Sequence, residues 1–68
     1  MKFNERLRAI RIEKGILQKQ AAEEMKLSPT AYSNYEQGLR EPDFATLKII
    51  CNYFEVSADY LIGIADSY

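Results

Sequence analysis

The sequence predicts an all-α fold, with five short helices in one compact domain of 68 residues. Apolar residues recur at spacings of three and four, as on the buried face of an amphipathic helix, and no segment alternates as a strand would. Residues that suit helix ends, such as Asn, Ser, Asp, Pro and Gly, separate these segments. The connections are two to five residues long, which is typical of a small helical bundle.

The first two helices are expected at about 4–14 and 18–25. Asn4 is suited to cap the first helix, and Gly15 is suited to end it because glycine adopts left-handed backbone angles easily. The apolar stripe of the first helix comprises Phe3, Leu7 and Ile10. The second helix has one small apolar face, made of Ala21, Ala22 and Met25.

The third helix is expected at 29–37, with Ser28 as its cap, proline in its first position and Gly38 at its end. At about 100° per residue, its two sides differ in kind. One side is apolar or aromatic and comprises Ala31, Tyr32 and Tyr35. The other side has only short or uncharged side chains, namely Pro29, Thr30, Ser33, Asn34 and Gln37.

The last two helices are expected at 43–54 and 57–62. Asp43 and Ser57 are suited to cap them, and Gly63 is suited to end the fifth. The apolar stripe of the fourth helix comprises Phe44, Leu47, Cys51 and Phe54. We interpret the cysteine in this stripe as a small core residue rather than as a reactive thiol.

The composition excludes several classes of function. The chain has no histidine and one cysteine, so it lacks the commonest general base and metal ligand and forms no internal disulfide. We therefore predict neither an enzyme nor a metal or cofactor site. There is no apolar run of about 18 residues and no signal-peptide pattern, so we expect a cytoplasmic protein without a membrane-spanning segment.

The charge is unevenly distributed along the chain. Residues 1–40 carry eight Lys or Arg and five Glu, whereas residues 41–68 carry one Lys and five Asp or Glu. The overall net charge of −1 conceals this difference. Either the charges cluster at random on a solvated surface, or the first part of the chain presents a basic face to an anionic partner.

The polar side of the third helix has an unusual composition for a solvent-facing surface. Lys and Glu are common on such surfaces because they favour helix formation and solubility. Short neutral donors and acceptors suit contact with the base edges of nucleic acid, where Asn or Gln pairs with adenine and Ser or Thr with several bases. An ordinary polar surface is the alternative interpretation.

Spacing, caps and apolar positions agree together in two stretches of the sequence. They read Arg11-x-x-Lys14-Gly15-x-x-Gln18-x-x-x-Ala22-x-x-Met25-x-Leu27-Ser28 and Tyr35-Glu36-Gln37-Gly38-x-Arg40-x-Pro42. With their surroundings, over about residues 3–63, they resemble the Xre/Cro-type family of lambda-repressor-like helix-turn-helix DNA-binding domains. The resemblance implies a helix-turn-helix at about 18–37.

The resemblance also implies a role for individual residues. Contacts to DNA phosphates are implied for Gln18, Lys19, Gln37 and Arg40, although a plain surface charge is the alternative for the arginine. Contacts to base edges are implied for Ser28, Pro29, Thr30, Ser33 and Asn34, and the last three are favoured. Arg11 and Glu36 resemble the structural ion pair that joins the first helix to the end of the third.

Several positions depart from the family pattern. Leu17 stands where Thr or Ser often caps the second helix, and Lys26 stands where a turn glycine is usual, at a strain of roughly 1 kcal/mol. Pro29 replaces a polar residue that often reads a base. Asn34 and Gln37 stand where Arg is frequent, so we expect weaker nonspecific DNA binding than in a strongly basic repressor.

The resemblance implies a bacterial or phage-encoded transcriptional regulator, a repressor, that binds a palindromic operator in duplex DNA as a homodimer. Its two recognition helices would enter major grooves about one helical turn apart. Dimerisation is expected through helix five and the C-terminal tail, with contacts from Tyr60, Ile62, Ile64 and Tyr68. The alternative is a module of the same fold that acts chiefly through a regulatory protein partner, as an antitoxin or antirepressor target does, with DNA binding secondary.

Overall fold

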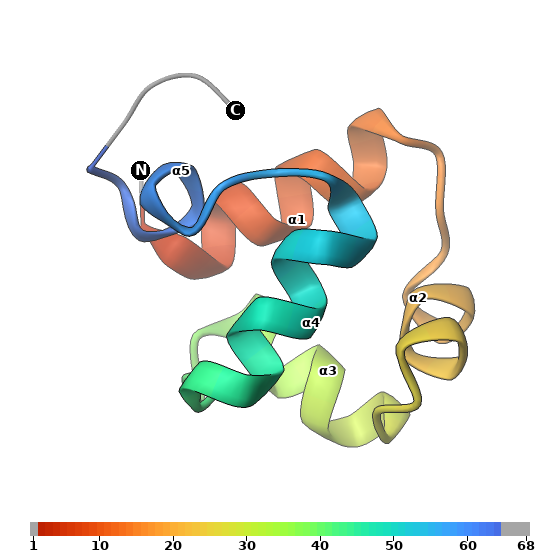
Figure 1. Ribbon diagram of the computed structural model, residues 1–68. Coiled ribbons are helices and arrows are strands. Elements are labelled where there is room, and N and C mark those ends of the chain that lie inside the picture. The colour runs from red at the N-terminus through yellow and green to blue at the C-terminus, as the bar shows by residue number, and fades with distance from the viewer. Residues whose placement is uncertain (1, 65–68) are drawn as a thin grey trace.

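The computed structural model describes residues 2–64, and within them the predicted all-α fold is confirmed. The five helices are α1 (Phe3–Glu13), α2 (Gln18–Met25), α3 (Pro29–Gln37), α4 (Phe44–Phe54) and α5 (Ala58–Ile62) (Figure 1). Over the same residues, none of the helices combines the length and the apolar character that crossing a membrane requires. Tyr68, which was expected to contribute to dimerisation, lies outside the described residues.

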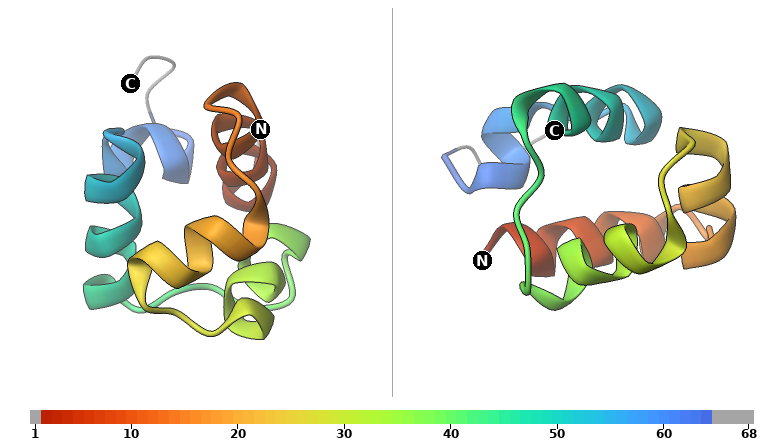
Figure 2. Two further views of the ribbon diagram at one scale, coloured as in Figure 1. Left: turned by 90° about the vertical axis from the view of Figure 1, so that its right-hand side faces the viewer. Right: turned by 90° about the horizontal axis from the view of Figure 1, so that it is seen from below.

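The helices surround one core. Helix α1 packs against α3 and α5, α2 packs against α3 and α4, and α4 packs against α5. Figure 2 shows α1 and α3 side by side on one side of the molecule, with α4 and α5 on the other. Helix α3 therefore has one face against α1 and α2 and another face at the edge of the molecule (Figure 1).

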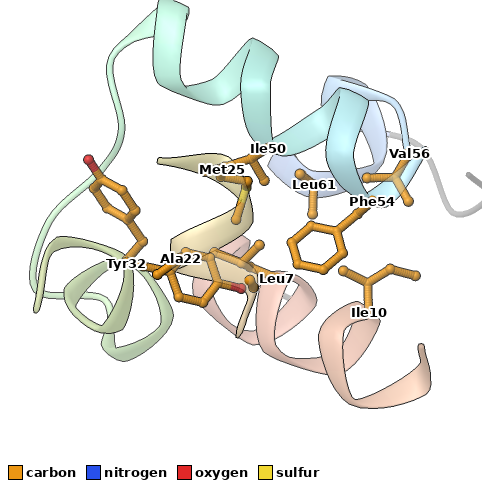
Figure 3. Close-up of a cluster of buried hydrophobic side chains, with 11 residues drawn as sticks. Leu7, Ile10, Ala22, Met25, Tyr32, Ile50, Phe54, Val56 and Leu61 are labelled. Carbon is orange, nitrogen blue, oxygen red and sulfur yellow. The ribbon is translucent and has the colours of Figure 1, made fainter. Parts of the chain in front are cut away.

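The core takes side chains from every helix and is closed by Val56 from the α4–α5 connection. Phe54 is fully buried, and its ring lies between Ile10 and Leu61 (Figure 3). The buried apolar set is Leu7, Ile10, Ala21, Ala22, Met25, Tyr32, Tyr35, Ile50, Phe54, Val56 and Leu61. Because α1 supplies Leu7 and Ile10 and α3 supplies both tyrosines, burial of these residues orients α3 relative to the rest of the molecule.

The apolar stripe predicted for α4 is wrong at its first residue. Phe44 is 90% exposed, whereas Ile50, which was not assigned to the stripe, is fully buried. Side chains on a helix lean toward its N-terminus, so a residue in the first turn of α4 extends beyond the core that the later turns cover. Cys51 is partly buried against the core, and this burial raises the pKa of its thiol.

The start of α1 also differs from the prediction. The N-cap is Lys2, not Asn4, and the backbone N–H of Lys2 donates to the Glu5 carboxylate at 2.9 Å. Asn4 instead lies within the first turn and packs over Gly38, where a Cβ atom would be 3.3 Å from the Asn4 Cγ. With a φ of +77° at Gly38, this close approach explains why glycine ends α3.

The other predicted caps are present. Hydroxyl or carboxylate oxygens of Ser28, Asp43 and Ser57 accept the backbone N–H of Ala31, Thr46 and Tyr60 at 3.0, 2.8 and 3.0 Å. Leu17 makes no side-chain cap on α2, and Lys26 adopts left-handed angles at the end of α2, as expected. Glu55 is also left-handed, at the end of α4, and this was not predicted.

Polar contacts hold the outer helices. The buried Arg6 of α1 donates to the Tyr60 carbonyl at 2.9 Å and lies 4.6 Å from the centroid of the Tyr60 ring, which joins α1 to α5. The Tyr53 hydroxyl of α4 donates to the Glu24 carboxylate of α2. Burial and this hydrogen bond raise the pKa of Tyr53 to about 12. The contacts thus keep α2 and α5 in place around α1 and α4.

Candidate nucleic-acid interface

Helices α2 and α3 are short and are joined by a three-residue turn, 26–28. Ala21 and Ala22 are fully buried, and such small side chains allow a close approach of α2 to its neighbours. The left-handed Lys26 reverses the chain, and the backbone N–H of Leu27 then donates to the Ala22 carbonyl at 2.9 Å. Ser28 starts α3 immediately afterwards. The turn therefore sets the angle between the two helices.

The neutral polar side chains of α3 form one exposed face. Tyr32, Tyr35 and Glu36 are buried on the opposite side, which leaves the remaining positions toward solvent. Ser28, Pro29, Thr30 and Gln37 are exposed, and Ser33 and Asn34 are partly exposed. The structure therefore brings together the five residues predicted for base contacts. We call Ser28, Pro29, Thr30, Ser33 and Asn34 the outer face of α3.

Hydrogen bonds within the chain occupy some of these groups and leave others available. The Ser28 hydroxyl oxygen accepts from the backbone as a cap, and the Ser33 hydroxyl accepts from the Gln37 amide at 2.7 Å. Within residues 2–64, the side chains of Thr30 and Asn34 make no hydrogen bond. These two side chains can thus pair with a ligand without breaking an internal contact.

The predicted phosphate contacts lie around the outer face of α3 rather than within it. Gln18 and Lys19 open α2, whose N-cap Leu17 supplies no side-chain hydrogen bond. Gln37 ends α3 and Arg40 follows in the loop, with both residues exposed. The Gln18 amide is partly exposed and donates from Nε2 to Glu36 Oε1 at 3.0 Å, a contact that was not predicted.

Arg11 and Glu36 form a bidentate ion pair beneath this surface. Arg11 Nε and Nη2 donate to the two carboxylate oxygens at 2.7 and 3.1 Å, and Nη1 donates to the Ile16 carbonyl at 2.8 Å. Burial acts to raise the pKa of Glu36, but the Arg11 guanidinium, with further contributions from Tyr32 and Gln18, outweighs burial and holds the pKa below its usual value. The carboxylate is therefore ionised at neutral pH.

A surface hollow of about 590 Å³ lies at the end of α3, between the start of α1, the α3–α4 loop and α4. We call it the apolar hollow, after its lining by Phe3, Pro42, Phe44, Leu47 and Ile62. Its polar lining includes Lys2, Arg40 and Glu41. The hollow was not predicted from the sequence because the segments that line it lie far apart in the chain. The one signal in the sequence was Phe44, an apolar residue directly after the cap residue Asp43.

The residues predicted for dimerisation are only partly together on the surface. Ile62 and Ile64 are 52% and 76% exposed, and Ile62 also lines the apolar hollow. Tyr60 is partly buried, packs against the core and contacts Arg6. Tyr60 therefore serves the α1–α5 contact, whereas the two isoleucines remain accessible.

Comparison with known proteins identifies the family. The family model described as Helix-turn-helix matches residues 7–61. The chain belongs to the helix-turn-helix family. This confirms the resemblance found in the sequence, and the helix-turn-helix family is a class of DNA-binding regulators, not of enzymes.

Named helix-turn-helix relatives match most of this chain. The transcriptional regulator ImmR of Bacillus subtilis is 41% identical over 63 residues, which cover 93% of this chain and 50% of ImmR. The transcriptional activator BcrR of Enterococcus faecalis is 40% identical over 63 residues, covering 93% of this chain and 31% of BcrR. The chain thus spans half or less of the length of these two relatives.

The fold of the P22 c2 repressor is also similar. Its crystal structure, in complex with synthetic operator 9T, superposes with a TM-score of 0.86 at 29% sequence identity. The match covers 91% of this chain and 94% of the repressor chain. The lambda-repressor-like fold predicted for this helix-turn-helix chain is therefore confirmed.

Proposed function

We propose that this chain is the DNA-binding domain of a transcriptional repressor and that it binds a palindromic operator as a homodimer. Helix α3 enters the major groove and α2 lies against the phosphates. The observation that carries the proposal is the outer face of α3, which gathers neutral hydrogen-bonding side chains on one exposed side of a helix whose other side is buried. The similarity to a repressor in complex with its operator supports the same orientation.

The outer face of α3 has the chemistry needed to read bases. In the major groove each base pair presents its own pattern of donors, acceptors and methyl groups. The Asn34 amide can donate to and accept from adenine, and the Thr30 hydroxyl and methyl suit several bases. Pro29 and Ser28 lie at the N-terminal end of α3, which approaches the groove first in helix-turn-helix proteins.

Phosphate contacts come from both sides of this face. Gln18 and Lys19 lie at the N-terminus of α2, where backbone N–H groups and the helix dipole favour an anion. Gln37 is the last residue of α3, and Arg40 follows it in the loop, so both lie at the end of α3 that is farther from Ser28. Only two of these four residues are cationic, so electrostatic attraction contributes modestly and sequence-specific contacts carry more of the affinity.

A second copy of the chain is the proposed occupant of the apolar hollow and the adjacent Ile62 and Ile64. Phe44 protrudes from the same patch that contains the hollow, so a two-fold arrangement lets each copy insert its ring against the other. The patch adjoins the C-terminal end of α3, so the two recognition helices would lie on the same side of the dimer.

Selection from a library of random DNA duplexes tests the proposal. The purified protein is incubated with the library at moderate salt, and the bound fraction is sequenced. We expect an enriched palindrome whose half-site centres are about 10 bp apart. Absence of enrichment from a folded, helical protein would contradict sequence-specific binding and would favour the protein-partner function, which a pull-down would then test.

Replacement of Asn34 and Arg40 by alanine should separate base reading from phosphate contact. N34A is expected to lose about 1–3 kcal/mol of binding free energy on the selected site and little on random DNA.

R40A is expected to weaken binding to all sequences alike and to reduce the slope of log K against log salt by about one.

Fluorescence anisotropy at several salt concentrations measures both effects, and each variant serves as the control for the other. An equal loss of affinity for N34A on selected and random DNA would exclude base reading by Asn34. An unchanged salt slope for R40A would mean that Arg40 touches no phosphate and is a plain surface charge.

A further inference from the structure

The Glu36 carboxylate receives hydrogen bonds from two other helices. Its Oε2 accepts from Arg11 Nε of α1 at 2.7 Å. Its Oε1 accepts from Arg11 Nη2 at 3.1 Å and from the Gln18 amide of α2 at 3.0 Å. One buried anion at the end of the recognition helix is thus bonded to the core helix α1 and to the first residue of α2.

Glu36 itself is not placed to touch DNA. Its side chain is 1% exposed, and a carboxylate would repel a phosphate. Gln18, in contrast, is partly exposed at the start of α2. Any influence of Glu36 on phosphate binding must therefore pass through a neighbour. Of its two hydrogen-bonded partners on other helices, Gln18 lies at the start of α2, where a phosphate contact is proposed, whereas the Arg11 side chain is 11% exposed and its nitrogens donate to Glu36 and to the Ile16 carbonyl.

The Glu36 contact limits the freedom of the Gln18 side chain. An amide nitrogen has two N–H groups, and Gln18 uses one of them on Glu36. The second N–H remains for another acceptor. A free glutamine side chain loses much rotamer freedom when it binds a ligand, so a side chain already held in one orientation binds with less loss of entropy.

We propose that Glu36 is a positioning residue for DNA binding, because it orients the Gln18 amide toward a backbone phosphate. The inference rests on the proposed function and deepens it. It gives Glu36 a second role beside the ion pair with Arg11, since the two carboxylate oxygens are shared between the two partners. The orientation of the phosphate contact on α2 is then tied to the end of the helix that reads the bases.

A double-mutant cycle tests the role of Glu36. The variants are Gln18→Ala, Glu36→Gln and the double variant, and the probe is a mixed-sequence duplex of about 20 bp, because phosphate contacts do not depend on sequence. Gln18→Ala is expected to weaken binding about tenfold, as for loss of a hydrogen bond to a charged group. Glu36→Gln is expected to weaken binding several-fold when Gln18 is present and to have no further effect when it is absent.

Lys19→Ala provides the matched control, since Lys19 is the neighbouring residue on α2 and, within residues 2–64, forms no hydrogen bond or ion pair with Glu36. The effects of Lys19→Ala and Glu36→Gln should be additive. Glu36→Asp is the second variant in case Glu36→Gln unfolds, because it keeps a negative charge near Arg11 while its shorter side chain withdraws both oxygens and removes the hydrogen bond to Gln18. Circular dichroism at the assay temperature verifies that each variant is folded.

The outcomes separate the inference from the proposed function. Equal losses from Glu36→Gln or Glu36→Asp with and without Gln18 would overturn the positioning role and leave DNA binding intact. Failure of the wild-type chain to bind any duplex would overturn the proposed function and the positioning role together. Non-additivity of Glu36 with Gln18 but not with Lys19 is the result that supports the inference.

Discussion

Replacing Arg11 by methionine is expected to remove about 3–5 kcal/mol of unfolding free energy, because Glu36 then remains as a buried and unpaired anion. The Glu36 side chain is 1% exposed, so water cannot take the place of the guanidinium. A domain of this size has a total stability of roughly 3–10 kcal/mol. The substitution should therefore remove from about a third to all of the stability of the domain at 25 °C.

This loss should depend on pH in a defined direction. In the wild type the pKa of Glu36 is lowered by folding. Its ionisation therefore stabilises the fold at pH values above the pKa that Glu36 has in the unfolded chain. This contribution is lost as the pH falls through the pKa of Glu36 in the folded state. In R11M burial dominates and raises the Glu36 pKa. Protonation of Glu36 then removes the buried unpaired charge and restores part of the lost stability. The difference in stability should be largest near pH 7 and shrink as pH falls through about 4.

Urea unfolding followed by circular dichroism at pH 7 and near pH 3.5 measures both effects. Arg8→Met is the matched control, because Arg8 lies on the same helix and is exposed. It should change stability by about 0.5 kcal/mol or less. A loss for R11M no greater than that for R8M, or a loss that grows with acidity, would contradict a dominant role for the buried ion pair.

Replacing Phe54 by alanine is expected to destabilise the domain by about 3–5 kcal/mol. Its ring is fully buried and lies between α1 and α5, so the substitution leaves a cavity where three helices meet. Phe44 is the natural control: it is the same residue type, on the same helix, but 90% exposed. Phe44→Ala should change stability by about 0.5 kcal/mol or less.

Thermal and urea unfolding of the two variants compare these positions directly. Similar losses for both would mean that Phe44 is buried in solution, as the apolar stripe read from the sequence suggests. A large loss for F54A with a small loss for F44A would support the described core. Measurements at low protein concentration keep any self-association through the apolar hollow from contributing to stability.

The helices were predictable because their signals are local. Caps such as Ser28 and Asp43 accept a backbone N–H three residues later, so their effect does not depend on the rest of the molecule. The same holds for glycine at position 38, where the backbone turns left-handed. The predicted start of α1 was wrong because another local interaction is formed instead. The Glu5 carboxylate accepts the backbone N–H of Lys2, so the helix begins before Asn4 and includes it.

The candidate site was predictable in its composition but not in its connections. The outer face of α3 follows from helical periodicity once the two tyrosines are assigned to the core. The Gln18–Glu36 hydrogen bond joins residues 18 positions apart, and its existence depends on the angle between α2 and α3. No pattern in the sequence indicates the angle between α2 and α3.

The sequence by itself determined the number and order of the helices, most of their ends and the polar face of α3, because periodicity and capping act within a few residues. Only the tertiary structure decided which apolar residues of α4 are buried. Phe44 and Phe54 look equivalent in the sequence, yet one lies in solvent and the other at the centre of the core. The difference arises because the core has limited extent and the first turn of α4 projects past it, and burial is a property of all the helices together.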